Sequence, residues 1–151
     1  MKINKVALLI AFVIASLLFL EVAARADEAN QSIKITFSQA TEIPGQILPA
    51  GTYVFKLADP NDLDVVQIFN SEGTHLYATL QTIEAERRKP AGHTIVVLAE
   101  RPDGRPDTLL QWFYPGSTSG HEFVYSKQEE QLLTQDRQQT VRAKQTAAAA
   151  D

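Results

Sequence analysis

Apolar and polar residues alternate with period two along most of this chain, and that pattern constrains the fold more than any other feature. Ile33, Ile35 and Phe37 alternate with polar neighbours, which is typical of a strand with one buried face. About eight short segments have strand character, with Pro, Gly, Asn and Asp between them. They are residues 32–37, 46–48, 52–58, 63–70, 74–83, 94–99, 109–114 and 122–125.

The connections between these segments indicate which kind of β fold to expect. Parallel neighbours need long crossover connections, usually helical, and no helical period interrupts residues 32–125. Short strands with turn residues between them are typical of sandwiches and small barrels. We therefore expect an all-β domain over residues 32–127, an antiparallel β-sandwich or a partly open small barrel.

The composition changes at the C-terminal end. Residues 128–145 contain neither Gly nor Pro and favour a helix, although large apolar residues are few. Leu132 and Leu133 are the residues through which this helix could dock on the domain, and a solvated helix is the alternative. Residues 146–151 are mostly Ala and are predicted to be a disordered tail, so 128–151 form a polar helical extension and tail.

The N-terminal segment has the three parts of a secretory signal peptide. Lys2 and Lys5 form a basic region, residues 6–20 an apolar run, and Ala24-Arg25-Ala26 a cleavage site for signal peptidase. The run is shorter than the roughly 20 residues of a spanning helix. We predict cleavage after Ala26 and a periplasmic or secreted protein with no stable membrane insertion. An uncleaved anchor is the alternative.

Charge and cysteine content exclude several functions for the exported chain. The segment 1–26 carries three of the 14 basic residues and one of the 18 acidic residues, which leaves 11 against 17 and a net charge of -6. Such a charge does not attract nucleic acid or anionic lipid. The chain has no cysteine, so thiol redox chemistry and thiolate zinc sites are excluded, and the domain must fold by packing alone. No cofactor is predicted.

Histidines and nearby acids offer one candidate site. His93 and His121 each follow a glycine, and they begin strands that could share one end of the sheet. A two-histidine metal site completed by Glu122 or Asp107 is then expected as one alternative, and a hydrolase that uses His93, His121 and Glu122 as another. No G-x-S-x-G motif supports a serine nucleophile. The alternative is that these are ordinary surface or strand-edge histidines.

Aromatic residues offer a second candidate site. Trp112 and Tyr114 lie on one face of a predicted strand and Phe113 on the other. With Tyr77 or Tyr125 nearby, an exposed aromatic platform could stack sugars or peptide. The alternative is that both faces of this strand are core. A basic cluster, Arg87-Arg88-Lys89, lies at a predicted hairpin end and is interpreted as a solvated loop.

Several stretches resemble a family of small exported proteins from Gram-negative soil bacteria that has no assigned activity. They are IPGQILPAGTY at 43–53, QIFN at 67–70 with GTHL at 73–76, and WFYPG at 112–116 with EFVY at 122–125. The resemblance implies export and a β domain, and it implies no activity. LPAGTY at 48–53 is also similar to prealbumin-like and collagen-adhesin B-type sandwich modules, which favours a sandwich.

These observations lead to one functional expectation and two alternatives. We expect an exported, non-enzymatic β module that binds an envelope or extracellular protein or glycan. The first alternative is a secreted hydrolase or metal-assisted enzyme that uses His93, His121 and Glu122. The second is a carrier of a small apolar ligand, which predicts an interior cavity of about 300 Å³ or more.

Overall fold

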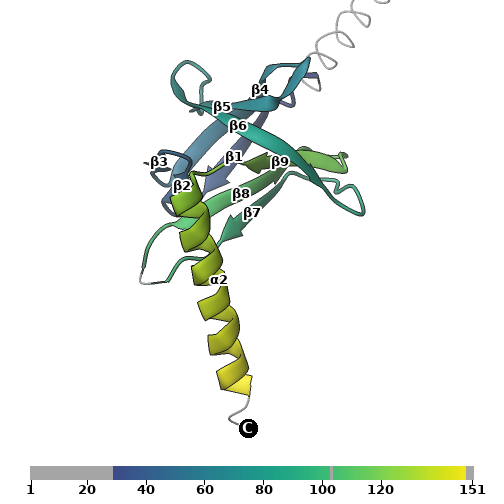
Figure 1. Cartoon of the computed structure of the whole chain (residues 1–151). Coiled ribbons are helices and arrows are strands. Elements are labelled where there is room, and N and C mark those ends of the chain that lie inside the picture. The colour runs from purple at the N-terminus through teal and green to yellow at the C-terminus, as the bar shows by residue number, and fades with distance from the viewer. Residues whose placement is uncertain (1–28, 103, 149–151) are drawn as a thin grey trace, which may run out of the picture.

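The computed structural model describes residues 29–102 and 104–148, with side chains as far as Arg137. This part of the chain is mostly β, as the alternating pattern predicts, and it ends in a helix (Figure 1). The elements are β1 (Ile33–Phe37), β2 (Thr41–Ile43), β3 (Gln46–Leu48), β4 (Gly51–Asp59), β5 (Asp62–Asn70), β6 (Leu76–Glu86), β7 (Ile95–Ala99), β8 (Asp107–Phe113), β9 (Ser119–Phe123) and α2 (Lys127–Ala148). The predicted signal peptide, residues 1–26, lies outside the described residues.

The nine strands within the described residues form one mixed sheet that is not closed. Its order is β1-β4-β5-β6-β9-β8-β2-β3, and β7 pairs with β8. Every pair is antiparallel except β2 with β8, which are parallel through Thr41–Asp107 and Glu42–Thr108. The antiparallel prediction therefore misses one short parallel contact. The strands β3 to β7 form the connection between β2 and β8, in place of the helical crossover that the sequence lacks.

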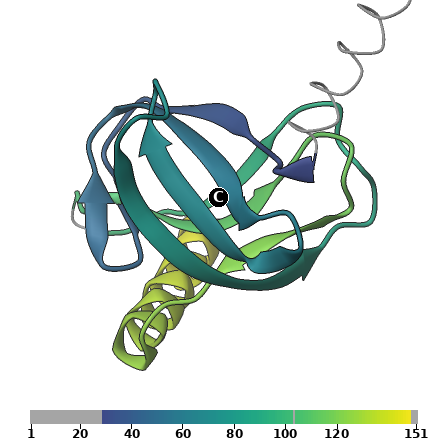
Figure 2. The same ribbon diagram turned by 90° about the horizontal axis from the view of Figure 1, so that it is seen from above.

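Strand β6 connects the two halves of the sheet. Its first half pairs with β5, from Leu76 to Gln81, and its second half pairs with β9, from Thr82 to Glu86. The sheet therefore bends along β6 and curls around its own interior, with α2 outside it (Figure 2). The interior is filled by large apolar side chains, among which Phe55 and Trp112 are fully buried and meet edge to face with ring centroids 5.6 Å apart.

The helix α2 begins with a capping box. The Ser126 hydroxyl accepts from the Glu129 backbone N–H, and the Glu129 carboxylate accepts from the Ser126 N–H and hydroxyl. Leu133 is buried against the core while Leu132 is exposed, so the helix docks through one of the two predicted leucines. The helix continues to Ala148, so the tail predicted from residue 146 starts too early. Residues 149–151 lie outside the described part.

Across the described ranges, no helix combines the length and apolar character needed to cross a membrane.

Candidate functional site

The four aromatic residues predicted to form a platform do not share one exposed face. Trp112 is fully buried and stacks on His121, with ring centroids 5.1 Å apart. Tyr125 is buried, and its hydroxyl donates to the Leu109 carbonyl at 2.6 Å. Tyr114 is half-buried against the core. For these three residues the structure matches the alternative, in which the aromatic rings belong to the core.

Tyr77 differs from the other three because its side chain is 40% exposed. Its ring meets those of His75 and Tyr53 edge to face, with centroids 4.9 and 5.5 Å apart. Burial raises the pKa of Tyr53, and electrostatic repulsion from Tyr77 adds to this shift. The Tyr53 hydroxyl donates to the Pro49 carbonyl. Tyr77 therefore sits on a small aromatic cluster at the start of β6, apart from the buried rings.

The predicted metal ligands are not assembled into a site. Successive strand residues point to opposite faces, and His121 is buried while Glu122 accepts a hydrogen bond from the Gln111 amide on the other face. His93 is exposed in the connection between β6 and β7. Among the side chains described, those of residues 29–102 and 104–137, no group of three or more His, Asp or Glu could hold a metal ion.

Ser119, which lies two residues before His121, is not hydrogen-bonded to that histidine. The Ser119 hydroxyl donates to the Glu84 carboxylate at 3.1 Å. The two ring nitrogens of His121 face other partners, the Leu63 carbonyl at 3.0 Å and the side-chain oxygen of Gln31 at 2.8 Å. A serine nucleophile needs a histidine that accepts its proton, and this arrangement does not provide one.

His121 instead ties three segments of the chain together. Because a carbonyl can only accept, Nδ1–H donates to Leu63 in β5, and Nε2 faces Gln31 in the segment before β1. Burial lowers the pKa of His121, and the hydrogen bond to Leu63 and the charge of Asp64 offset this in part. A neutral ring accepts at Nε2, where the Gln31 oxygen lies, so a neutral His121 requires the Gln31 amide to be turned over so that its NH₂ group faces the ring.

The pH dependence of stability provides a test of this assignment. A histidine whose pKa is lowered by folding binds fewer protons in the native state than in the unfolded state. We therefore expect the free energy of unfolding to fall as the pH drops below the ordinary histidine pKa of 6.5 and on through the lowered value. Urea denaturation between about pH 8 and 5 measures this. A His121→Gln variant should lack this component. A wild-type protein that becomes more stable over the same interval would show that His121 is charged in the fold.

A groove lies between α2 and the outer face of β8 and β9. Its volume is about 280 Å³. Gln111 and Glu122 are directly paired neighbours in the sheet, and their hydrogen bond of 2.9 Å lies along one wall. Leu110, Phe123, Tyr125 and Leu133 also line the groove, as do Glu130, Thr134 and Arg137 from the helix.

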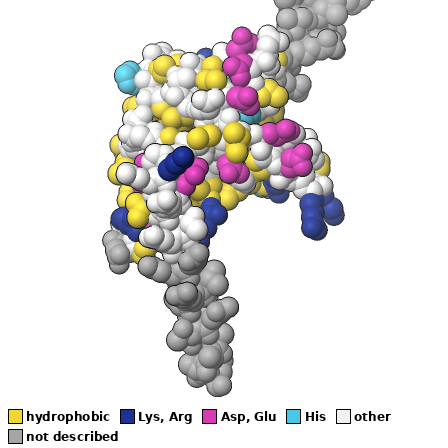
Figure 3. Space-filling view, in the orientation of Figure 1, with side chains coloured by type: hydrophobic (Ala, Val, Ile, Leu, Met, Phe, Trp, Pro, Cys, Tyr) yellow, Lys and Arg dark blue, Asp and Glu magenta, His cyan; other side chains and the backbone are white. Residues whose placement is uncertain are grey.

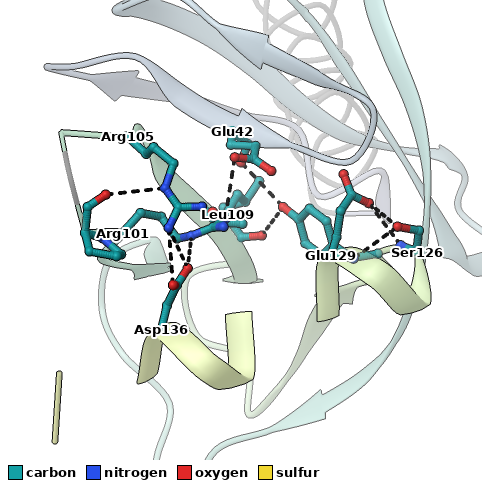
Figure 4. A network of polar contacts seen from close by, with 10 residues as sticks. Glu42, Arg101, Arg105, Leu109, Ser126, Glu129 and Asp136 are labelled. Carbon is teal, nitrogen blue, oxygen red and sulfur yellow. Dashed lines mark hydrogen bonds and ion pairs between the residues drawn. The ribbon is translucent and has the colours of Figure 1, made fainter. Parts of the chain in front are cut away.

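A buried ionic network fixes the helix that forms the second wall (Figure 4). Asp136 accepts from the Arg101 guanidinium at 2.7 Å and from Arg105 at 3.2 Å. Arg101 also donates to the Thr108 hydroxyl at 2.9 Å and lies 3.6 Å from Glu42. The side chains of Arg101 and Asp136 are 5% and 9% exposed, so these charges compensate each other away from water.

Tyr125 links the network to the groove. Its ring lines the groove, and its hydroxyl reaches the Leu109 and Glu42 carbonyls on β8 and β2. Burial raises the pKa of this phenol well above its ordinary value, and the nearby carboxylates of Glu42 and Glu129 add to the shift. Tyr125 is therefore a neutral hydrogen-bond donor that fixes the floor of the groove.

Sequence reasoning identified three residues of this groove, Glu122, Tyr125 and Leu133, but for other roles. It missed Gln111, although a polar residue within the apolar strand LLQWF marks a special environment. It also missed the Ser126-x-x-Glu129 capping pattern, which gives the start of α2 and hence the face that carries Glu130, Leu133 and Arg137.

Comparisons with protein-family models, with curated proteins and with solved structures find no match to this chain.

Proposed function

We propose that this protein is an exported, non-enzymatic interaction module, a partly open small barrel that binds a basic side chain of a partner protein in the groove between α2 and β8–β9. The observation that carries the proposal is the composition of that groove. Two carboxylates, Glu122 and Glu130, line it against one guanidinium, Arg137. The groove therefore has a net negative charge and attracts a cation.

The size and the apolar part of the groove favour a side chain over a larger ligand. Small-molecule pockets usually have about 300–1,000 Å³, and this groove lies just below that range. Leu110, Phe123 and Leu133 provide apolar surface for a methylene stem. The carboxylates can accept charge-assisted hydrogen bonds from an arginine or lysine head group, and arginine suits them best because it can donate two parallel bonds.

The carrier alternative has less support than the groove. An apolar ligand inside the domain needs empty space between the halves of the sheet. Phe55, Leu57, Leu109 and Trp112 are almost fully buried there and belong to one core cluster.

Calorimetric titration of the exported protein with acetyl-arginine amide tests the proposed function. We expect a dissociation constant on the order of 1 mM, as for a single charged side chain. The neutral isostere acetyl-citrulline amide should bind at least tenfold more weakly. Glu122→Gln should weaken arginine binding about five- to tenfold through the lost charge, a difference of roughly 1 kcal/mol, while its amide can still accept from Gln111.

The matched control is Glu72→Gln, which removes an exposed carboxylate from the turn between β5 and β6. This variant should bind the arginine probe like the wild type. Equal affinity for the citrulline and arginine probes, or equal losses in the Glu122 and Glu72 variants, would refute the proposal.

Export itself is tested by intact mass. The basic residues, apolar run and Ala24-Arg25-Ala26 site of the leader support cleavage. We expect protein recovered from the periplasm or medium to begin at Asp27. A recovered mass that includes residues 1–26 would contradict the proposed cleavage.

A further inference from the structure

A basic tip projects from the domain on the side away from α2. It consists of Arg87, Arg88 and Lys89, which follow β6 directly. Arg88 and Lys89 are exposed, whereas Arg87 folds back with its guanidinium 5.3 Å from the centre of the Phe113 ring. Figure 3 shows Lys and Arg side chains gathered at this projecting tip, and acidic side chains on the surface between the tip and the helix.

The base of the tip is fixed by the neighbouring loop between β8 and β9. The Arg87 backbone N–H donates to the Thr118 carbonyl at 2.8 Å. On the other side of the tip, the Gly116 N–H donates to the Ala91 carbonyl at 2.7 Å. Arg88 and Lys89 are therefore presented from a supported loop, which lowers the entropy lost when they bind a partner.

We propose that the partner of the groove is a second copy of this chain, whose Arg88 and Lys89 insert beside Glu122 and Glu130. This inference rests on the proposed function of the groove. The tip supplies what the groove requires, which is exposed cationic groups on long methylene stems, and the groove supplies the opposite charge. The same chain thus carries both halves of a complementary pair.

The positions of the two halves determine the kind of assembly. The tip and α2 lie on opposite sides of the domain in both ribbon views, so a molecule cannot insert its own tip into its own groove (Figures 1 and 2). A contact between two different surfaces is heterologous, and it leaves a free tip on one copy and a free groove on the other. Repetition therefore produces a ring or an open chain of molecules.

Charge also sets the strength of this contact. Glu84 and Glu86 precede the tip, and the exported chain has a net charge of -6, so two copies repel each other at long range. The attraction is local, and salt screens it over about 10 Å at 0.1 M ionic strength. We expect weak association, with a dissociation constant on the order of 0.1 mM at low salt that rises at least tenfold at about 0.5 M salt.

Sedimentation equilibrium of the exported protein tests the inference. Two double variants should each stay monomeric. The first, Arg88→Glu with Lys89→Glu, reverses the charge of the tip. The second, Glu122→Gln with Glu130→Lys, reverses the charge of the groove. An equimolar mixture of the two variants should associate again. The acidic tip of the first fits the basic groove of the second, and the unchanged tip of the second fits the unchanged groove of the first. Circular dichroism verifies that each variant is folded.

Two results would overturn the inference. One is a wild-type protein that stays monomeric at about 1 mM and low salt, roughly ten times the expected dissociation constant. The other is a reversed-tip variant that associates as strongly as the wild type. If acetyl-arginine amide still binds in a Glu122-dependent manner in either case, the groove function stands and only the self-association fails. If the arginine probe also fails to bind, both proposals are wrong.

Discussion

Replacing Asp136 with Ala is expected to lower the free energy of unfolding by about 3–5 kcal/mol. The Arg101 side chain is 5% exposed and makes its shortest ionic contact, 2.7 Å, with Asp136. Without that carboxylate, the buried guanidinium keeps Thr108 and the more distant Glu42 as its partners among the described residues. Urea denaturation followed by tryptophan fluorescence measures the loss, since Trp112 is the only tryptophan.

The matched control for this prediction is Arg105→Ala. The Arg105 side chain is 41% exposed and contacts the same carboxylate at 3.2 Å. Its removal should lower the free energy of unfolding by less than about 1 kcal/mol, as for a solvent-exposed ion pair.

The Asp136→Ala variant should also bind the arginine probe more weakly than the wild type, because α2 forms one wall of the groove. This is measured at a temperature where the variant is still folded. Equal small losses in the two variants would mean that the network does not hold α2 on the sheet.

Gly120→Ala is the second substitution with a large expected effect. Gly120 begins the buried part of β9, and a Cβ added there would lie 2.6 Å from the Trp112 carbonyl oxygen and from Cε1 of Phe113. The carbonyl is part of the sheet backbone and cannot turn away. We expect a loss of about 3 kcal/mol, at the upper end of the cost of overpacking, and a denaturation midpoint shifted to lower urea.

Gly116→Ala separates this steric effect from the general cost of replacing a loop glycine. Gly116 has a φ of 80° but open space where its Cβ would be. Its replacement should cost about 1 kcal/mol, from backbone strain alone. If Gly120→Ala costs no more than Gly116→Ala, then β9 does not pass as close to β8 as the structure has it.

The sequence predicts most strands because alternation has a direct structural meaning. Ile35 and Phe37 are buried where the period places them, and β4 and β5 repeat the pattern. Strand β2 was missed because no Gly or Pro turn precedes Thr41–Ile43, whereas the equally short β3 lies between two Pro/Gly turns. The change of partner along β6 was also missed, since alternation gives the face of a residue but not the strand beside it.

The candidate site is less predictable because it depends on contacts between distant residues. The groove exists because α2 docks on the sheet, and the contacts that dock it join Asp136 to Arg101 and bury Leu133. Thirty-five residues separate Asp136 from Arg101, and no local pattern relates them. Trp112 was expected on a binding platform, but its place in the core depends on the layers that cover it, which a single strand does not reveal.

The most direct test of the groove as a binding site is a nuclear magnetic resonance titration of the ¹⁵N-labelled exported protein with acetyl-arginine amide. We expect the amide signals of Gln111, Glu122 and Thr134 to shift together and to saturate, because these residues line the groove on both walls. The signals of His75 and Tyr77 should stay unchanged. Shifts confined to that aromatic cluster, or no saturable shift in the groove, would contradict a binding site between α2 and the sheet.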